Sequence, residues 1–174
     1  MESKVVASRI PSILTAMEYH VDDQDPALSV RAIVIRDGHL LVQKGSVNSF
    51  ANDPRTCYGF IGGHYEPGDT FVERLRMEFE EETNASVVSC TYAFVVENKR
   101  IYNGVLLQSV DHFFDVEIDR HDISTKESHL TQHWLPIETL KQFDLRPKVL
   151  RDLIAEGKSY DARHVIVPLK AERL

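Results

Sequence analysis

Hydrophobic residues occur along the chain in short runs that alternate with polar and glycine-rich segments. Two β-branched and aliphatic runs, at 29–36 and 39–44, are separated by Asp37-Gly38. They predict a β-hairpin, because Asp-Gly favours the two-residue turns that join antiparallel strands. A polar stretch at 45–55 follows and predicts a loop that leads into a short strand at 57–61.

The second half of the pattern predicts helices as well as strands. Residues 70–83 contain no Gly or Pro and begin at good N-cap residues, Asp69 and Thr70, so this segment is predicted to be helical. The remaining regular elements are expected to be two strands and a second helix, at 87–97, 106–118 and 147–156. Strands flanked by helices in this way favour the α/β class, with a sandwich around a mixed β-sheet.

The 174 residues fit one globular domain with a short extension. The only linker-like composition is at 20–26, a segment rich in Asp that ends in Pro. Residues 1–27 are therefore predicted to be an N-terminal extension packed on the domain, and residues 28–174 to be the domain itself.

Composition and charge exclude several classes of function. The chain has 20 Lys and Arg against 27 Asp and Glu, a net charge of −7, which argues against nucleic-acid or anionic-membrane partners. No apolar run approaches the roughly 20 residues needed to cross a bilayer, and the N-terminus lacks a secretion signal, so a cytoplasmic location is expected. Cys57 and Cys90 have no spacing that indicates a disulfide framework or a zinc site.

The predicted helix at 70–83 carries three carboxylates on one edge. Glu78, Glu81 and Glu82 lie within about one turn of one another, beside the apolar stripe that the helix is expected to bury. Like charges this close repel unless a cation binds them or one of them takes up a proton. The cluster therefore has the chemistry of a Mg²⁺ or Mn²⁺ phosphate site. The alternative is an ordinary solvated acidic helix.

Glycines before the helix favour the metal and phosphate interpretation. Gly62 and Gly63 directly follow the predicted strand at 57–61, and Gly68 precedes the helix. Glycines allow a backbone to adopt positive φ and to approach a ligand closely. A glycine-rich loop that leads from a strand into a carboxylate-bearing helix is typical of a site for phosphate and metal.

The segment from Gly63 to Ala85 resembles the signature motif of the Nudix hydrolases. That motif is Gly, five residues, Glu, seven residues, Arg-Glu, an apolar residue, any residue, Glu-Glu, any residue, Gly and an apolar residue, and it overlays this segment without a gap. The Asp37-Gly38 hairpin and the late Trp134-Leu135-Pro136 also look like landmarks of the family. The resemblance covers about residues 29–156.

The resemblance implies an α/β/α sandwich and a Mg²⁺-dependent pyrophosphohydrolase. Its substrate would be a nucleoside di- or triphosphate, or a nucleoside diphosphate linked to another group. By the same resemblance Glu78, Glu81, Glu82 and the backbone carbonyl of Gly63 would hold the metal. A carboxylate would activate the attacking water, and it would lie either in the helix or in the loop before Trp134. In that loop Glu127 is the candidate for the base or for an added metal ligand, and the alternative is an ordinary exposed loop glutamate.

Three positions depart from the motif. Asp69 stands in place of the first Glu, Met77 in place of the Arg, and Asn84 in place of the final Gly. Asn tolerates the left-handed conformation of a helix end, so the last change is expected to be mild. Met77 removes the family's guanidinium, and Arg74, one turn before Glu78, is the candidate to replace it as an orienting residue. The alternative is a catalytically impaired Nudix-fold module that binds nucleotides or regulates.

The sequence also contains candidates for contacts to the nucleotide. Basic residues could meet phosphates and aromatic residues could stack on a base, although aromatic residues in strands also form core. The candidates are Arg31, Lys44, Arg55, Tyr58 and Phe60. The expected partner is a small-molecule nucleotide, and the sequence leaves open whether the chain forms a homodimer.

Overall fold

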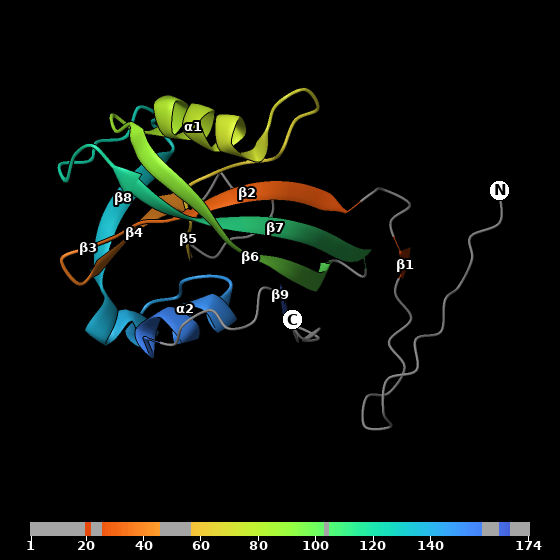
Figure 1. Ribbon diagram of the computed structural model, residues 1–174. Coiled ribbons are helices and arrows are strands. Elements are labelled where there is room, and N and C mark those ends of the chain that lie inside the picture. Colours follow the sequence, from red (N-terminus) through yellow and green to blue (C-terminus); the bar gives the residue numbers. More distant parts are fainter. Residues whose placement is uncertain (1–19, 22–25, 46–56, 103–104, 158–163, 168–174) are drawn as a thin grey trace.

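The computed structural model describes residues 20–21, 26–45, 57–102, 105–157 and 164–167. In these ranges the strands form two sheets, with a helix on each side (Figure 1). Most of the predicted N-terminal extension lies outside the described residues, as does Arg55, so the predictions for both stay untested. No helix in the described ranges is both long enough and apolar enough to cross a membrane.

The first sheet contains the longest strands of the molecule. Its members are β1 (His20–Val21), β2 (Ala27–Ile33), β6 (Val87–Tyr102), β7 (Val105–Ile118) and β9 (His164–Ile166). β6 and β7, the two strands predicted at 87–97 and 106–118, pair antiparallel, whereas β1 and β2 run parallel to β7 and β9 runs parallel to β6. This sheet is therefore mixed.

The second sheet is antiparallel. It contains β3 (Ile35–Arg36), β4 (His39–Gly45), β5 (Tyr58–Gly59) and β8 (Leu130–Pro136). Its centre is β4, which pairs with all three of the others. The predicted strand at 57–61 is shorter than expected, because after Gly59 the chain leaves β4 and bonds instead to β2, where Ala32 donates its N–H to the carbonyl of Ile61 at 2.9 Å.

The predicted hairpin at 29–44 is confirmed at its turn and divided at its first strand. Asp37 and Gly38 both have positive φ, 49° and 72°, as a two-residue hairpin turn requires. The run at 29–36 is interrupted at Val34, so that β2 joins the first sheet and β3 joins the second. This segment therefore links the two sheets.

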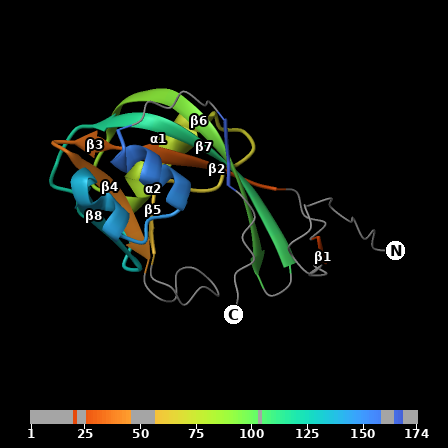
Figure 2. The ribbon, with the colours of Figure 1, turned by 90° about the horizontal axis from the view of Figure 1, so that it is seen from below.

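Two hydrophobic cores lie on opposite sides of the strands, as the sandwich prediction requires. Helix α1 (Phe71–Glu82) buries Leu75 and Phe79 in one core, against Val30 and Leu41. The second core lies under α2 (Lys148–Ala155) and the short 3₁₀ helix η1 (Ile137–Gln142), where Figure 2 shows α2 in front of the strands. The predicted α/β class is confirmed.

The outer edge of β6 is irregular. The pairing of β6 with β7 shifts register between Val87 and Ser89 and again between Tyr92 and Phe94. On its other side β6 pairs with β9 only from Val95 to Glu97. The side chains of Val88 and Tyr92, before that short pairing, are exposed.

Candidate active site

Helix α1 begins at a well-formed cap that sets which residues face inward. Thr70 accepts a hydrogen bond from the backbone N–H of Glu73 at 3.2 Å, and Glu73 accepts one from the N–H of Thr70 at 2.8 Å. This reciprocal capping box stabilises the first turn. With the helix started at Phe71, Leu75 and Phe79 are fully buried, and the glutamates follow on the flank of the same stripe.

The three helix glutamates differ in their surroundings. Glu78 and Glu82 are buried, with relative exposures of 6% and 9%. The side chain of Glu81 is 53% exposed. The sequence predicts three carboxylates in one region, whereas the structure separates a buried pair from a third carboxylate at the solvent edge.

Arg74 lies among these carboxylates. Its Nη2 donates a hydrogen bond to Oε1 of Glu78 and lies 3.7 Å from Oε2 of Glu81, and its Nη1 lies 3.9 Å from Oε1 of Glu66. Burial by itself lowers the pKa of Arg74, but the hydrogen bond and the charge of Glu78 outweigh it and raise that pKa. Met77, at the motif's Arg position, is 39% exposed. The guanidinium nearest to Glu78 and Glu81 on this helix is thus that of Arg74.

Glu82 is the least satisfied of the glutamates. Its Oε1 accepts a long hydrogen bond of 3.5 Å from Nε2 of Gln43, and its Oε2 is buried with no hydrogen-bond partner among the described residues. Burial, together with the smaller effect of the neighbouring charge of Glu78, raises the pKa of Glu82 to about 7. Gln43, Arg31 and the backbone of Gly62 partly offset it.

The glycine loop is held between β2 and the carboxylate of Glu78. Gly62 has a φ of 132°, and a Cβ there would overlap the carbonyl of Val30. A Cβ on Gly63 would overlap the carboxylate of Glu78. The carbonyl of Gly63, the predicted metal ligand, accepts the N–H of Val30 at 3.0 Å, and the carbonyl of Gly62 accepts a hydrogen bond from Arg31.

Glu127 lies on a loop that is attached to the end of α1. The backbone N–H of Lys126 donates to the carbonyl of Glu82 at 3.0 Å, which brings the loop to the last turn of the helix. The carboxylate of Glu127 is paired with Nε2 of His129 at 2.9 Å. Glu127 therefore lies beside the C-terminal end of α1, and its carboxylate contacts His129.

Two of the predicted nucleotide contacts lie away from the glutamates. Side chains alternate along β4, and because Gln43 reaches Glu82, Lys44 points to the opposite face. There its Nζ lies 5.2 Å above the ring of Tyr58, which also packs against Phe143. Lys44 and Tyr58 thus lie together on the α2 side of the second sheet, whereas Arg31 remains close enough to Glu82 to affect its pKa.

Phe60 requires a correction. It is 3% exposed and packs edge-to-face against Phe113 in the core under α2, with ring centroids 5.1 Å apart. Its side chain is therefore part of the core, and the prediction that it contacts a nucleotide is wrong.

Gln43 and Gln132 both approach Glu82, and neither was predicted from the sequence to belong to the site. Nε2 of Gln132 donates a long hydrogen bond of 3.5 Å to the carbonyl of Glu82, and the Oε1 atoms of both glutamines are buried with no partner in the part of the chain that the structure describes. One signal was available for Gln43, because a glutamine among the aliphatic residues of β4 is an unusual side chain to bury. Gln132 pairs directly with Gln43 across the two strands.

The donor atoms of this site fit a hard divalent cation. No group of three His, Cys, Asp or Glu side chains in the described ranges lies close enough together to hold a metal by itself. Mg²⁺ usually needs less from the protein, because it binds one or two carboxylates and completes its shell with water and substrate phosphates. The buried pair Glu78 and Glu82 meets that requirement, because its ligand atoms are all oxygens and one of them, Oε2 of Glu82, has no hydrogen-bond partner within the described ranges.

Both the sequence and the fold of this chain are similar to those of known Nudix proteins. The sequence model of the NUDIX domain matches residues 25–156, and no curated protein matches the chain significantly. A MutT NUDIX hydrolase from Burkholderia pseudomallei has a similar structure, with a TM-score of 0.63 at 20% identity over 78% of this chain and 99% of that one. A MutT protein from Methanosarcina mazei gives 0.63 at 21% identity, over 78% and 98%. A NUDIX hydrolase from Nitrosomonas europaea gives 0.62 at 18% identity, over 76% and 89%.

Proposed function

Because the chain belongs to the Nudix family, we propose that it is a Mg²⁺-dependent pyrophosphohydrolase. Its substrate would be a small nucleoside di- or triphosphate, or a nucleoside diphosphate linked to another group. One observation carries this proposal. The buried side-chain polar atoms without a partner in the described residues belong to Gln43, Arg74, Glu82 and Gln132, and all four side chains lie around the buried glutamate pair.

Unpartnered buried polar atoms are costly, about 1–3 kcal/mol each, and native proteins contain few of them. Their concentration at one place is expected where a polar ligand completes the shell. The same place carries the motif glutamates and the glycine loop, so a cation and the phosphates of a nucleotide are the ligands we propose for it.

Glu78 and Glu82 would hold the cation on the buried side of α1, and Glu81 would hold it at the solvent edge. The carbonyl of Gly63 is a further candidate ligand, because a carbonyl oxygen that accepts one hydrogen bond keeps a second lone pair. When bound, Mg²⁺ neutralises phosphate oxygens and lowers the pKa of a coordinated water.

Three other side chains would prepare the reaction. Arg74 holds the carboxylate of Glu78 in place through its hydrogen bond. Arg31 secures the carbonyl of Gly62 and therefore the course of the glycine loop. Glu127 would take a proton from the water that attacks phosphorus, while the bond between phosphorus and the bridging oxygen breaks and the two phosphate products separate.

A second candidate function is a Nudix-fold module that binds or senses nucleotides without hydrolysing them. The observation that favours it is the loss of the motif's guanidinium at Met77. The position of Arg74 weakens this candidate, because a guanidinium still contacts Glu78. The cytoplasmic location stays a prediction of the sequence, and whether the chain forms a homodimer stays open.

The test is phosphate release from a panel of nucleoside di- and triphosphates and nucleotide sugars, with Mg²⁺ and with a chelator. Glu78→Gln and Glu82→Gln should each lower turnover by about 10²-fold or more, as loss of a catalytic electrostatic contact does. Glu80→Gln is the matched control, because it makes the same change on an exposed side chain of the same helix. Nucleotide binding without phosphate release from any substrate would favour the binding module instead.

A further inference from the structure

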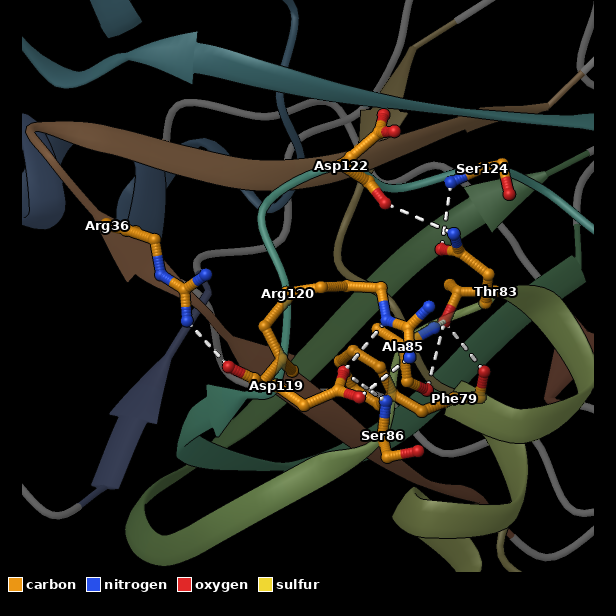
Figure 3. A network of polar contacts seen from close by, with 11 residues as sticks. Arg36, Phe79, Thr83, Ala85, Ser86, Asp119, Arg120, Asp122 and Ser124 are labelled. Atoms are coloured by element: carbon orange, nitrogen blue, oxygen red, sulfur yellow. Dashed lines mark hydrogen bonds and ion pairs between the residues drawn. The ribbon is translucent and has the colours of Figure 1, made fainter.

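Asn84, the residue that replaces the final Gly of the motif, joins α1 to the loop that carries Glu127. Its Oδ1 accepts the backbone N–H of Ser124 at 3.0 Å, and its Nδ2 donates to the carbonyl of Asp122 at 3.1 Å. Its own N–H donates to the carbonyl of Ser124 at 3.1 Å. Figure 3 shows Asp122 and Ser124, the two loop residues that take part in these side-chain hydrogen bonds.

The same loop completes the C-terminal end of the helix. The last carbonyls of a helix have no partner within it, and they attract positive charge. The last turn of α1 contains no basic residue. Lys126 of the loop compensates, because its Nζ donates to the carbonyl of Glu80 at 2.6 Å and its backbone N–H donates to that of Glu82 at 3.0 Å.

The conformation of Asn84 shows why an amide stands there. Among the described residues other than Gly, only Asp37 has positive φ, so Asn84 does not adopt the left-handed conformation expected from the motif. That expectation was wrong. The helix ends at an extended residue, Thr83, with a φ of −135°. Asn84 therefore does not use the backbone freedom that Gly would provide. A Gly at this position could form neither of the two side-chain hydrogen bonds that Asn84 forms.

Order at Ser124 extends along the loop to Glu127. The hydroxyl of Thr125 donates to the carbonyl of Glu127 at 2.9 Å and accepts the N–H of Glu127 at 3.1 Å. Thr83 and Thr125 also form an isolated antiparallel bridge. Every residue from Ser124 to Glu127 is thus bonded to α1, to Thr83 or Asn84 just after the helix, or within a local turn.

We propose that Asn84 is a positioning residue that fixes the loop 122–127, and with it Glu127, against the C-terminal end of α1. The catalytic part of this inference rests on the proposed function, in which Glu127 receives the proton of the attacking water. Asn84 does not touch the reacting atoms. Its effect passes through the backbone of Ser124 and the turn at Thr125.

The first measurement is hydrogen exchange in the parent and in Asn84→Gly, which restores the motif residue and removes the amide. The N–H groups of Ser124 and Lys126 should exchange about tenfold faster or more in the variant, because one loses its acceptor and the other loses its fixed loop. Asn84→Asp keeps an acceptor for Ser124 and loses the donor to Asp122, so its exchange should be intermediate. Ser86→Ala, an exposed change two residues away, is the control and should leave exchange unchanged.

The second measurement is a double-mutant cycle with Glu127→Gln, in steady-state hydrolysis. Asn84→Gly alone should lower kcat by roughly tenfold and change KM by less than about twofold, as expected when an interaction of the transition state is lost. In the Glu127→Gln background the same change should have little further effect, because the group that Asn84 positions has been removed.

Two results would overturn the inference. Unchanged exchange at Ser124 and Lys126 in Asn84→Gly would show that the amide does not hold the loop. Faster exchange combined with rate losses that simply add in the cycle would show that Asn84 acts independently of Glu127. A parent protein that releases no phosphate would overturn the proposed function and the catalytic part of this inference, whereas the exchange measurement would still decide whether Asn84 holds the loop.

Discussion

Two regions of α1 differ in whether their polar groups have hydrogen-bond partners: the C-terminal end of the helix, and the side that carries Glu78 and Glu82, called the flank here. At the end, the carbonyls of Phe79, Glu80 and Glu82 all have donors, supplied by Thr83 and Lys126. On the flank, the buried side chains around Glu78 and Glu82 keep four polar atoms without partners in the described ranges. Satisfied groups mark the scaffold, and unsatisfied ones mark the place where a ligand is expected.

The largest effect should come from filling the space between the glycine loop and the flank. Gly63→Ala places a methyl group where the carboxylate of Glu78 lies, so that carboxylate must move. A displacement of about 1 Å in a catalytic group can cost about 10²-fold, and we expect a loss of hydrolysis of that size or more. Gly59→Ala is the matched control, since a Cβ there meets nothing within 4 Å. Equal activity of the two variants would remove the flank from the catalytic site.

The next largest effect concerns stability and its pH dependence. The pKa of Glu82 in the folded protein is about 7, above the ordinary value of 4.5. Ionisation of the buried carboxyl therefore does not lower the free energy of unfolding below pH 4.5. It lowers that free energy increasingly as the pH rises toward 7, and by its full amount above that pH. Without metal, Glu82→Gln should stabilise the protein at pH 8 by up to about 3 kcal/mol and leave it almost unchanged at pH 4.5.

Denaturant unfolding at the two pH values, with and without Mg²⁺, measures this effect. Added Mg²⁺ should stabilise the parent and leave Glu82→Gln nearly unaffected, because the cation would relieve the cost that the variant lacks. Destabilisation by Glu82→Gln at pH 8 in a chelator would contradict this account of the flank.

A smaller effect is expected from Arg74, the cation that keeps the flank charges ordered. Arg74→Ala should lower activity at limiting Mg²⁺ by about tenfold, because the carboxylates of Glu78 and Glu81 lose a charged hydrogen-bond donor. Adding Met77→Arg to that variant should restore much of the activity. The two single variants and the double variant form one cycle, and simple additivity would mean that Arg74 does not replace the motif's Arg.

The smallest effect should come from the C-terminal end of α1, where the carbonyls have hydrogen-bond donors. Lys126→Met removes the charge that Lys126 brings to the carbonyl of Glu80, and a helix-end charge contributes about 0.3–1 kcal/mol. Thermal unfolding should shift by a few degrees at most. Lys148→Met is the control. Lys148 lies at the N-terminal end of α2, where a positive charge does not stabilise a helix, so this change should not destabilise the protein. A loss at Lys126 as large as the flank effects would break the distinction between the two regions.

Local patterns predicted the elements of this fold well. The predicted helix at 70–83 is observed at Phe71–Glu82, and the Asp37-Gly38 turn has the expected backbone. These features depend on capping and turn preferences of neighbouring residues, which are present in the sequence. The division of 29–36 between two sheets was not predicted, because it depends on pairing with β7, some 80 residues later in the chain.

For the candidate site, the sequence indicates residue types but not their arrangement in space. Helical spacing groups Glu78, Glu81 and Glu82, but it does not show which of them a neighbouring strand covers. That depends on Gln43 of β4, which reaches Glu82. The same alternation sends Lys44 to the far face, and a basic residue in a strand gives no sign of this until its register is known.

The irregular outer edge of β6 bears on how copies of this chain behave when crowded. An exposed strand edge is a template on which another chain can add a strand, and exposed apolar residues such as Val88 and Tyr92 increase that hazard. The two register shifts leave only the short stretch from Ser89 to Tyr92 in regular alignment before the edge meets β9. Bulges twist and interrupt an edge, so this one presents a poor surface for sheet-to-sheet aggregation despite its apolar side chains.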